Sequence, residues 1–358
     1  MLPKTAVIGA DLADATAPTP LPWPASGQGA VSIPSLGFSA QSGAEPPVPV
    51  ASMTKIMTAY VVLSDHPLAP GAGGPPITVT PADAAQFGTD TVTDQANVEL
   101  KAGEILNESQ MLQALLVHSA NDVAFALARW DAGSVTAFVA KMNATAAALG
   151  MHDTRFADAS GFDPRSTSSA ADLLKVAAAA MADPAFAEIV AMPAATLPIA
   201  GTVQTYTPLL GTPGVLGVKS GFTDAAGGGD VLAYRAAVGG RTFVVLAAVT
   251  SQEGPTVLLR SGNAALSLAK AAAARVRTAT VARAGTLVAR IEAGGRRVAA
   301  RTTAAASVLY IPGEKVRQIV HVRKPAAGTR RGTLIGTAVF RVGTQDVSVP
   351  VRLAARMP

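Results

Sequence analysis

Ser52 and Lys55 are the first residues of the chain whose types and spacing suggest chemistry. Residues 52–55, Ser-Met-Thr-Lys, put a hydroxyl and an amine one helical turn apart on the same face of a helix start. A serine nucleophile needs a base, and a lysine amine could serve as one. The pattern alone is weak, because two fixed letters in such a window should occur about once by chance in a chain of this length. A helix-capping serine followed by a surface lysine is the ordinary alternative.

Two further polar stretches lie where side chains could converge on that pair. Residues 119–121, Ser-Ala-Asn, separate two apolar helical segments, and we expect them in a short break that turns polar side chains inward. Residues 219–221, Lys-Ser-Gly, follow a strand-like run, where the lysine could meet a carboxylate and the glycine would let another backbone approach closely. Each stretch alone could equally be a cap, a turn or a surface charge.

The Ser52 pair stands at the expected start of a helix. Pro47 and Pro49 prevent a helix from extending backwards, so it can begin only around Ser52. Apolar residues then recur with the spacing of a buried helix face at Met53, Ile56, Met57 and Tyr60. The preceding residues 17–49 are rich in proline and carry short β-like pieces such as residues 30–33.

The other two stretches fall in a helical block and in a group of strands. Residues 107–182 are expected to be mostly helical without a strand, and Asn107 followed by Gln110 has the form of an N-cap and capping box. Strands separated by glycine-rich turns are predicted at residues 214–221, 231–238 and 241–249. A closing helix is predicted at residues 256–274.

The last part of the chain differs from the rest in pattern and in charge. After residue 276, short alternating segments separated by glycine-containing turns predict a small all-β domain. Residues 276–358 carry 15 Lys and Arg against three acids, a net charge of +12, whereas the first 275 residues carry −7. Such a module is expected near an anionic surface, which could be phospholipid, wall polymer or nucleic acid, although a solvated face is the ordinary alternative.

Composition argues against several other kinds of protein. The chain has no cysteine, which excludes disulfides, a thiolate nucleophile and sulfur-bound metal. Its four histidines are scattered without the spacing of a zinc hydrolase, so neither a metal nor a cofactor is expected. The long uncharged runs are broken by proline and glycine, so no transmembrane span is predicted. Aromatic residues are nearly absent after residue 276, which disfavours nucleic acid as a partner.

Taken together, in this order and each on its expected element, the three stretches form the SxxK, SxN and KTG-type set of penicillin-recognising serine enzymes. Residues 50–275 resemble the D-alanyl-D-alanine carboxypeptidase family, the low-molecular-mass penicillin-binding proteins. In two departures from the family pattern, Ser220 replaces the usual threonine and Phe222 replaces a histidine of some relatives. The likeness continues outside the motifs, at residues 138–143, 149–151, 158–162 and 222–227.

The resemblance implies a serine-type peptidase that removes the terminal D-alanine from peptidoglycan stem pentapeptides through an acyl-enzyme on Ser52. Lys55 would be its base, and Ser119 would pass a proton to the leaving amine. Asn121 would hold the substrate amide, and the backbone N–H groups of Ser52 and Phe222 would form the oxyanion hole. Further substrate contacts would come from Lys219, Ser220, Gly221, Phe222, Thr223 and Arg260. For Arg260, an exposed helix arginine is the ordinary alternative.

The resemblance also implies an α/β (α+β) fold of the penicillin-binding, β-lactamase-like transpeptidase type, with an antiparallel sheet flanked by helices. A helical subdomain is expected at about residues 80–200. We expect a catalytic domain over residues 1–275 and a basic β-rich domain over residues 276–358, which in the family stands the catalytic domain off the membrane.

The expected partners are peptidoglycan stem peptides, β-lactam antibiotics and, for the basic domain, an anionic membrane or wall surface. Class A β-lactamases share the three motifs but also use a deacylating glutamate, and residues 109–187 contain no glutamate, so penicillin should leave slowly. We expect an extracytoplasmic location, in the periplasm or cell envelope, with membrane association in the full-length protein and a trimmed soluble form here. A DD-endopeptidase on crosslinked stems and a non-catalytic wall-binding protein with a relic site stay open as alternatives.

Overall fold

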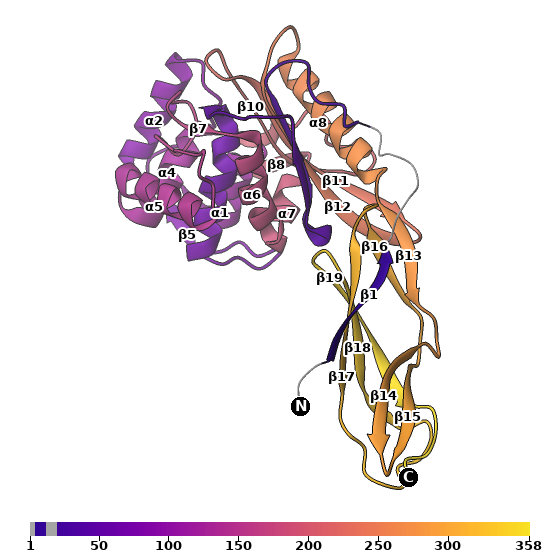
Figure 1. The fold of residues 1–358 in the computed structure, drawn as a ribbon. Helices are drawn as coiled ribbons and strands as arrows, with labels where there is room; N and C mark the ends of the chain where they lie inside the picture. Colours follow the sequence, from indigo (N-terminus) through magenta and orange to yellow (C-terminus); the bar gives the residue numbers. More distant parts are fainter. Residues whose placement is uncertain (1–3, 12–19) are drawn as a thin grey trace.

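The structure is a computed structural model, which describes residues 4–11 and 20–358, with side chains described from residue 20 onward. Figure 1 shows a wide upper body, in which helices cover a sheet, and a long narrow β body that extends away from it. Hydrogen bonds join the two bodies: Arg241 Nη1 donates to the carbonyl of Ser307 at 2.7 Å, and Thr344 Oγ1 donates to the carbonyl of Pro34 at 3.1 Å.

A five-stranded antiparallel sheet is the frame of the upper body. Its strands, in spatial order, are β10 (Val215–Thr223), β11 (Gly227–Val238), β12 (Arg241–Gln252), β2 (Gln28–Ile33) and β3 (Phe38–Gln41). The strands predicted after residue 214 and the β-like piece at residues 30–33 are therefore confirmed.

The two faces of this sheet pack against different layers. In β12, Leu246 and Ala248 join the core on the helical side, whereas Val245 and Ala247 face the opposite core, as strand alternation requires. The opposite core lies under α8 (Val257–Ala273), which packs on β11 and β12 and confirms the predicted closing helix. The reactive side chains discussed below lie at the edge strand β10 and on the helical side.

The helical side is built from one short 3₁₀ turn and seven α-helices within the described residues. These are η2 (Ala51–Thr54), α1 (Lys55–Asp65), α2 (Pro81–Val92), α3 (Glu108–Leu116), α4 (Asn121–Ala132), α5 (Val135–Ala148), α6 (Ala170–Met181) and α7 (Pro184–Val190). A second 3₁₀ turn, η1 (Pro34–Leu36), connects β2 to β3. Met53, Ile56 and Met57 are buried and Tyr60 is partly buried, so the predicted apolar face of the first helix is confirmed.

Local capping sets where the helices begin. Asn107 accepts a hydrogen bond from the backbone N–H of Gln110, whose side chain returns one to the backbone N–H of Asn107, so the predicted capping box is confirmed. The expectation of no strand within residues 107–182 is wrong in one place. The two-residue strand β7 (Thr167–Ser168) pairs with β4 (Val48–Pro49), a contact between segments too far apart in sequence for a local pattern to reveal.

Two more short antiparallel pairs complete the upper body. They join β5 (Pro76–Thr78) to β6 (Ile105–Asn107) and β8 (Ala194–Leu197) to β9 (Gly201–Gln204). Among the described residues no single helix is long and apolar enough to cross a membrane, while α4 and α5 together have that length and composition but meet at a bend of 86°.

The lower body is all β. Its larger sheet has the order β1 (Lys4–Asp11), β17 (Lys315–Val322), β18 (Leu334–Val342), β19 (Gln345–Leu353), β15 (Arg296–Thr302) and β14 (Leu287–Ala293). A second pair joins β13 (Arg277–Ala282) to β16 (Ala306–Tyr310). A separate apolar core, which includes Phe340, Val349 and Val351, confirms the small all-β domain.

The strand β1 departs from the predicted division of the chain. Lys4 pairs with Val320 and Val7 with Arg317, so residues 4–11 extend the C-terminal sheet, although they were expected in the domain of residues 1–275. Nothing in the sequence near residue 4 could show a partner more than 300 residues away. The boundary near residue 276 stays a prediction.

Candidate active site

The Ser52 hydroxyl lies next to the amine of Lys55. Ser52 is in the 3₁₀ turn η2, and Lys55 is the first residue of α1, so the tight turn brings both side chains to one side. Lys55 Nζ is 2.9 Å from Ser52 Oγ. Ser52 is partly exposed, whereas Lys55 is completely buried, so the hydroxyl can meet a substrate while the amine is shielded from water.

Lys55 has two further partners, and both are pure acceptors. Its amine donates to Asn121 Oδ1 at 2.5 Å and to the carbonyl of Ser160 at 2.9 Å. A protonated Lys55 donates to all three oxygens. A neutral amine has two N–H groups, which Asn121 Oδ1 and the Ser160 carbonyl satisfy, and this leaves its lone pair for the proton of Ser52. Burial, and next the positive charge of Lys219, hold the pKa of Lys55 well below its ordinary value. The arrangement therefore suits a lysine that accepts the proton of the serine.

The carbonyl of Ser160 is held in place by a turn built on Asp158. The carboxylate of Asp158 accepts from the hydroxyls of Ser160 (2.7 Å) and Ser166 (2.6 Å) and from the backbone N–H groups of Gly161 and Phe162. The sequence prediction did not assign Ser160 to the site, although residues 158–162 carried part of the family likeness. What acts here is a backbone oxygen, which a side-chain motif does not reveal.

Gly161 makes the close contact of this turn with η2 possible. Its φ is +83°, and a Cβ at this position would come within 1.8 Å of the carbonyl oxygen of Ala51. A larger residue would therefore push residues 158–162 away from Ser52 and carry the Ser160 carbonyl off Lys55.

Replacing Gly161 with alanine should lower the free energy of unfolding by at least about 2 kcal/mol, because a methyl group would both clash and sit at a left-handed φ. Gly240 is the matched control: its φ is +74°, but a Cβ there would meet nothing within 4 Å. Gly240→Ala should cost only the backbone strain, about 1 kcal/mol. Urea titration of both variants makes the comparison, and equal losses would contradict the packing role of Gly161.

The second predicted stretch occupies the break between α3 and α4, as expected. Ser119 is buried and has a left-handed φ of +64°, which turns the chain sharply between the two helices. No hydrogen bond to a described residue uses its hydroxyl. The Asn121 amide bridges two neighbours, since Oδ1 accepts from Lys55 and Nδ2 donates to Gln95 Oε1 at 2.6 Å. Gln95 lies in an irregular loop, and the sequence prediction missed it.

The third stretch lies on the edge strand β10, also as expected. Lys219 is buried and its amine donates to the carbonyl of Ser220 at 2.9 Å. Burial lowers the pKa of Lys219, an effect that the buried carboxylate of Asp230 partly offsets. A Cβ on Gly221 would lie 2.9 Å from the backbone nitrogen of Ser52, which confirms that a glycine is needed for close approach of the two backbones.

The remaining residues that were predicted to contact the substrate lie on β10 and near the start of α8. Ser220 is buried, and its hydroxyl already donates to the carbonyl of Tyr206 at 2.8 Å. Phe222 is half-exposed, and Thr223 ends the strand, with Oγ1 accepting from the N–H of Ala226. Arg260 is exposed near the start of α8, and no hydrogen bond or ion pair in the described chain links its side chain to the other site residues.

Comparisons with known proteins identify the family of the chain. The sequence model of the D-alanyl-D-alanine carboxypeptidase family matches residues 40–250, which is more than half of the chain. The chain belongs to this family. It is 36% identical to the D-alanyl-D-alanine carboxypeptidase DacB2 of Mycobacterium tuberculosis over 225 residues, covering 60% of this chain and 71% of that protein. It is 39% identical to a D-alanyl-D-alanine endopeptidase of Haemophilus influenzae over 130 residues, covering 36% and 41% respectively.

Solved structures are similar in fold. A variant of a Streptomyces DD-transpeptidase superposes with a TM-score of 0.61 at 26% identity, covering 70% of this chain and 98% of that one. A Streptococcus pneumoniae protein described as a peptidoglycan synthesis regulatory factor (PBP3) covers 93% of this chain and 99% of its own, with a TM-score of 0.69 at 21% identity. The predicted fold class and family are confirmed.

Proposed function

We propose that this enzyme is a serine-type D-Ala-D-Ala carboxypeptidase that works through an acyl-enzyme on Ser52. The observation that carries the proposal is the 2.9 Å contact between Ser52 Oγ and the fully buried amine of Lys55, whose other two partners are acceptors only. A lysine with only a structural role at a helix start would not need to be buried, because burial of an amine is costly. The burial of Lys55 therefore favours an active enzyme over a non-catalytic wall-binding protein with a relic site.

In the first half of the reaction, neutral Lys55 accepts the proton of Ser52 as Oγ attacks the carbonyl carbon between the two D-alanines. The new oxyanion is stabilised by the backbone N–H groups of Ser52 and Phe222, and the close approach of Gly221 to Ser52 supports this pairing. The carbon–nitrogen bond then breaks, and Ser119 passes its hydroxyl proton to the departing D-alanine amine while it takes up the proton that Lys55 received from Ser52. The other D-alanine carbonyl stays bound to Ser52 as an ester.

In the second half, water gives a proton to neutral Lys55 as it attacks the ester carbonyl, the bond from that carbon to Ser52 Oγ breaks, and Oγ takes the proton from Lys55. The shortened peptide leaves with a free carboxyl group, and Ser52 and Lys55 return to their starting forms.

Lys219 is buried, and its positive charge acts on Lys55, so it lies close to the reactive pair. In this position Lys219 attracts the terminal carboxylate of the substrate. The Ser220 hydroxyl can donate a hydrogen bond to the substrate carboxylate only if it gives up its hydrogen bond to the carbonyl of Tyr206. Thr223 and Arg260 are proposed as outer contacts.

The terminal D-alanine of a stem peptide is the proposed leaving group, and release of free D-alanine tests it. Purified protein should release D-alanine from an acyl-peptide that ends in D-Ala-D-Ala, and the Ser52→Ala variant should release none. Because some curated relatives are named D-alanyl-D-alanine endopeptidases, a crosslinked stem dimer is the second substrate to assay. Faster cleavage of the dimer than of the pentapeptide would favour the endopeptidase.

Penicillin should acylate Ser52 and then leave slowly, so the half-life of the adduct should be minutes or longer. Among the carboxylates that act on the charge of Lys55, that of Asp158 has the largest effect. It already accepts several hydrogen bonds and is not free to activate water. Hydrolysis of a chromogenic cephalosporin measures this directly. Sustained turnover at β-lactamase rates would contradict the prediction.

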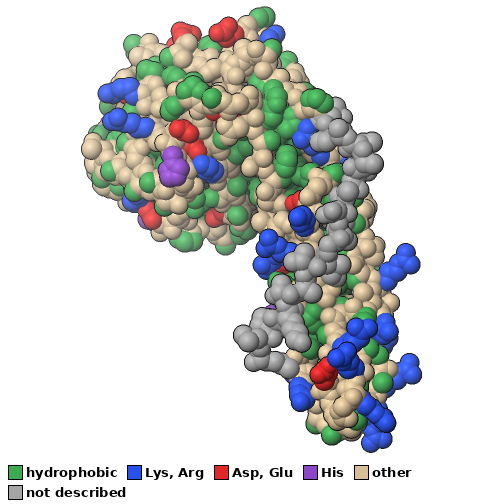
Figure 2. All heavy atoms as spheres, in the orientation of Figure 1, with side chains coloured by type: hydrophobic (Ala, Val, Ile, Leu, Met, Phe, Trp, Pro, Cys, Tyr) green, Lys and Arg blue, Asp and Glu red, His purple; other side chains and the backbone are tan. Residues whose placement is uncertain are grey.

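For the chain as a whole, we propose a catalytic domain up to residue 275, apart from β1, with a helical subdomain at about residues 80–200, and a β domain over residues 276–358. The β domain is proposed to meet an anionic membrane or wall surface in the cell envelope. Figure 2 shows Lys and Arg side chains spread over this body with few acids. Two of its three acids pair with arginines, Glu292 with Arg297 and Asp346 with Arg341. Co-sedimentation with anionic but not neutral vesicles, weakening with salt, would support this proposal.

A further inference from the structure

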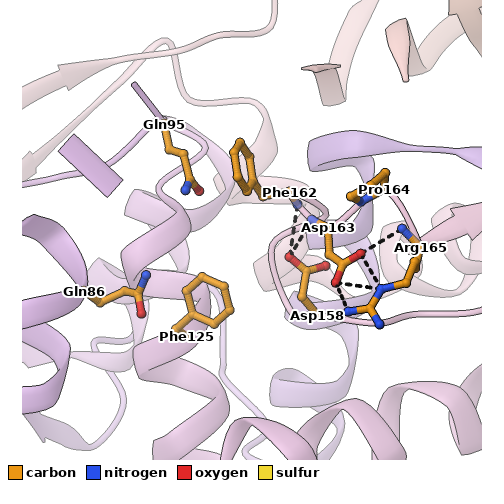
Figure 3. Close-up of a pocket in the computed structure, with 8 residues that line it drawn as sticks. All are labelled: Gln86, Gln95, Phe125, Asp158, Phe162, Asp163, Pro164 and Arg165. Carbon is orange, nitrogen blue, oxygen red and sulfur yellow. Dashed lines mark hydrogen bonds and ion pairs between the residues drawn. The ribbon is translucent and has the colours of Figure 1, made fainter. Parts of the chain in front are cut away.

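The segment of residues 95–98 lies against the start of α4, beside the reactive cluster. Asn121 binds it twice: the backbone N–H of Asn121 donates to the carbonyl of Ala96 at 2.7 Å, and Nδ2 donates to Gln95 Oε1 at 2.6 Å. Figure 3 shows the Gln95 side chain on the wall of a pocket that Asp158 also lines. Gln95 is therefore in contact with the cluster, although no step of the proposed reaction uses it.

The buried carboxylate of Asp122 holds the other end of this segment. Both of its oxygens lie 3.3 Å from the backbone nitrogen of Val98, and Oδ1 also accepts from the N–H of Val123 at 2.9 Å. Burial raises the pKa of Asp122 to about 7, which shows that the charged form is costly at this place. The hydrogen bonds from the backbone offset part of that cost and fix residues 95–98 beside α4.

A chain of hydrogen bonds determines which way the Asn121 amide faces. The Thr93 hydroxyl donates to the carbonyl of Thr89 in α2 at 2.9 Å, so its oxygen is left to accept from Gln95 Nε2 at 2.8 Å. Gln95 Oε1 then faces Asn121, and because an amide oxygen can only accept, the group of Asn121 that meets it is Nδ2. Asn121 Oδ1 is thereby turned to the amine of Lys55.

The orientation of this amide matters on both of its sides. With Oδ1 on Lys55, the second N–H of Asn121 Nδ2 stays available for a carbonyl oxygen of the bound substrate. An amide turned the other way would present N–H groups to Lys55 and an oxygen to that carbonyl. The neutral amine would lose an acceptor, and two oxygens would meet without a proton between them.

We infer that Gln95 is a positioning residue for acylation: it keeps Asn121 Oδ1 turned to the amine of Lys55, and Asp122 keeps Gln95 in place by holding residues 95–98. Gln95 acts through Asn121 and does not touch the reacting atoms. The inference rests on the proposed function, because it takes Lys55 to be the base of the acylation step.

The first test compares two replacements of Gln95. Gln95→Met keeps the length of the side chain but removes the amide, so it should lower the second-order rate of penicillin acylation by about tenfold or more. Gln95→Glu keeps an acceptor for Asn121 Nδ2, so its highest rate across the pH range should stay within about threefold of the wild type. The matched control is Gln113→Met, which changes a partly buried glutamine on α3 that donates to Ser109 Oγ, and it should acylate at the wild-type rate.

The pH–rate profile distinguishes this role from a loss of stability. Gln95→Glu adds a negative charge beside the partner of Lys55, which favours the protonated amine, so the acid limb should move to higher pH. Gln95→Met adds no charge and should lower the plateau of the profile. The charged groups that already act on Lys55 are Lys219, Asp158, Asp122 and Asp90.

Deuterium exchange gives a second readout that needs no catalysis. Asp122→Ala should raise deuterium uptake at residues 95–98 and slow acylation, because Gln95 is then held less firmly. Its control is Asp183→Ala, which removes a carboxylate that accepts from two backbone N–H groups at the start of α7 and should leave uptake at residues 95–98 unchanged. If Asp122→Ala does not fold, the two Gln95 variants decide the inference.

Three results would each overturn the inference: acylation of Gln95→Met within about threefold of the wild type, an equal loss of rate in Gln95→Glu, or unchanged uptake at residues 95–98 in folded Asp122→Ala. A wild type that penicillin does not acylate would instead overturn the proposed function. The exchange measurement would still decide whether Asp122 holds the segment.

Discussion

Replacing Lys55 with methionine should reduce the second-order rate of penicillin acylation by about 10³-fold or more, because the serine then has no base within reach. Methionine fills a similar buried volume without a charge, so the loss should reflect chemistry and not a cavity. The acceptors Asn121 Oδ1 and the Ser160 carbonyl lose a donor, which should cost stability but not the fold. Stopped-flow acylation with a fluorescent penicillin measures the rate.

The matched control for this experiment is Lys270→Met, which changes an exposed lysine on α8. It should acylate at the wild-type rate, and circular dichroism should show both variants folded. Acylation of Lys55→Met within tenfold of the wild type would contradict the assignment of Lys55 as the base.

Replacing Lys219 with methionine should move the acid limb of the pH–rate profile to higher pH. Burial is the main reason why the pKa of Lys55 is low, and the positive charge of Lys219 is the second. Because a neighbouring cation disfavours protonated Lys55, its removal lets the pKa of Lys55 rise. The base is then protonated over a wider range, and the rate at a given acidic pH falls.

The same variant should also lose affinity for substrates that end in a carboxylate, with kcat/KM near neutral pH falling about 100-fold. The pH profile separates the two effects, because loss of carboxylate binding alone lowers the rate at every pH without moving the limb. An acid limb that stays in place, or that moves to lower pH, would contradict the electrostatic role of Lys219. Lys270→Met again serves as the control that should shift nothing.

The sequence could predict the elements that carry the reactive side chains because their signals are local. Proline before Ser52, the Asn107 and Gln110 capping box and the alternating strands after residue 214 each depend on neighbours within a few residues. The three motifs could also be placed at a helix start, in an interhelical break and on a strand. The structure has them in the 3₁₀ turn that leads into α1, in the break before α4 and on β10.

The contacts that complete the site could not be predicted, because they join distant segments through groups that carry no motif. The Ser160 carbonyl reaches Lys55 across 105 residues, and its position depends on the hydrogen bonds that Asp158 accepts. Gln95 sits in a loop without periodic pattern, yet it fixes the orientation of the Asn121 amide. The hydrogen bond from the Ser220 hydroxyl to the carbonyl of Tyr206 likewise depends on a loop that packs against β10.

The pairings β4–β7 and β1–β17 were missed for a related reason. Register between strands is set by how the faces are buried and by the connections between them, and short strands carry too few residues to show an alternating pattern. In β7 only Thr167 and Ser168 pair, and in β1 the partner lies at the other end of the chain.

Intact-mass spectrometry after brief incubation with penicillin tests the central claim most directly. The wild type should gain one adduct of the mass of the drug, and the Ser52→Ala variant, folded by circular dichroism, should gain none. No adduct on folded wild-type protein, or an equal adduct on the variant, would contradict the assignment of Ser52 as the nucleophile.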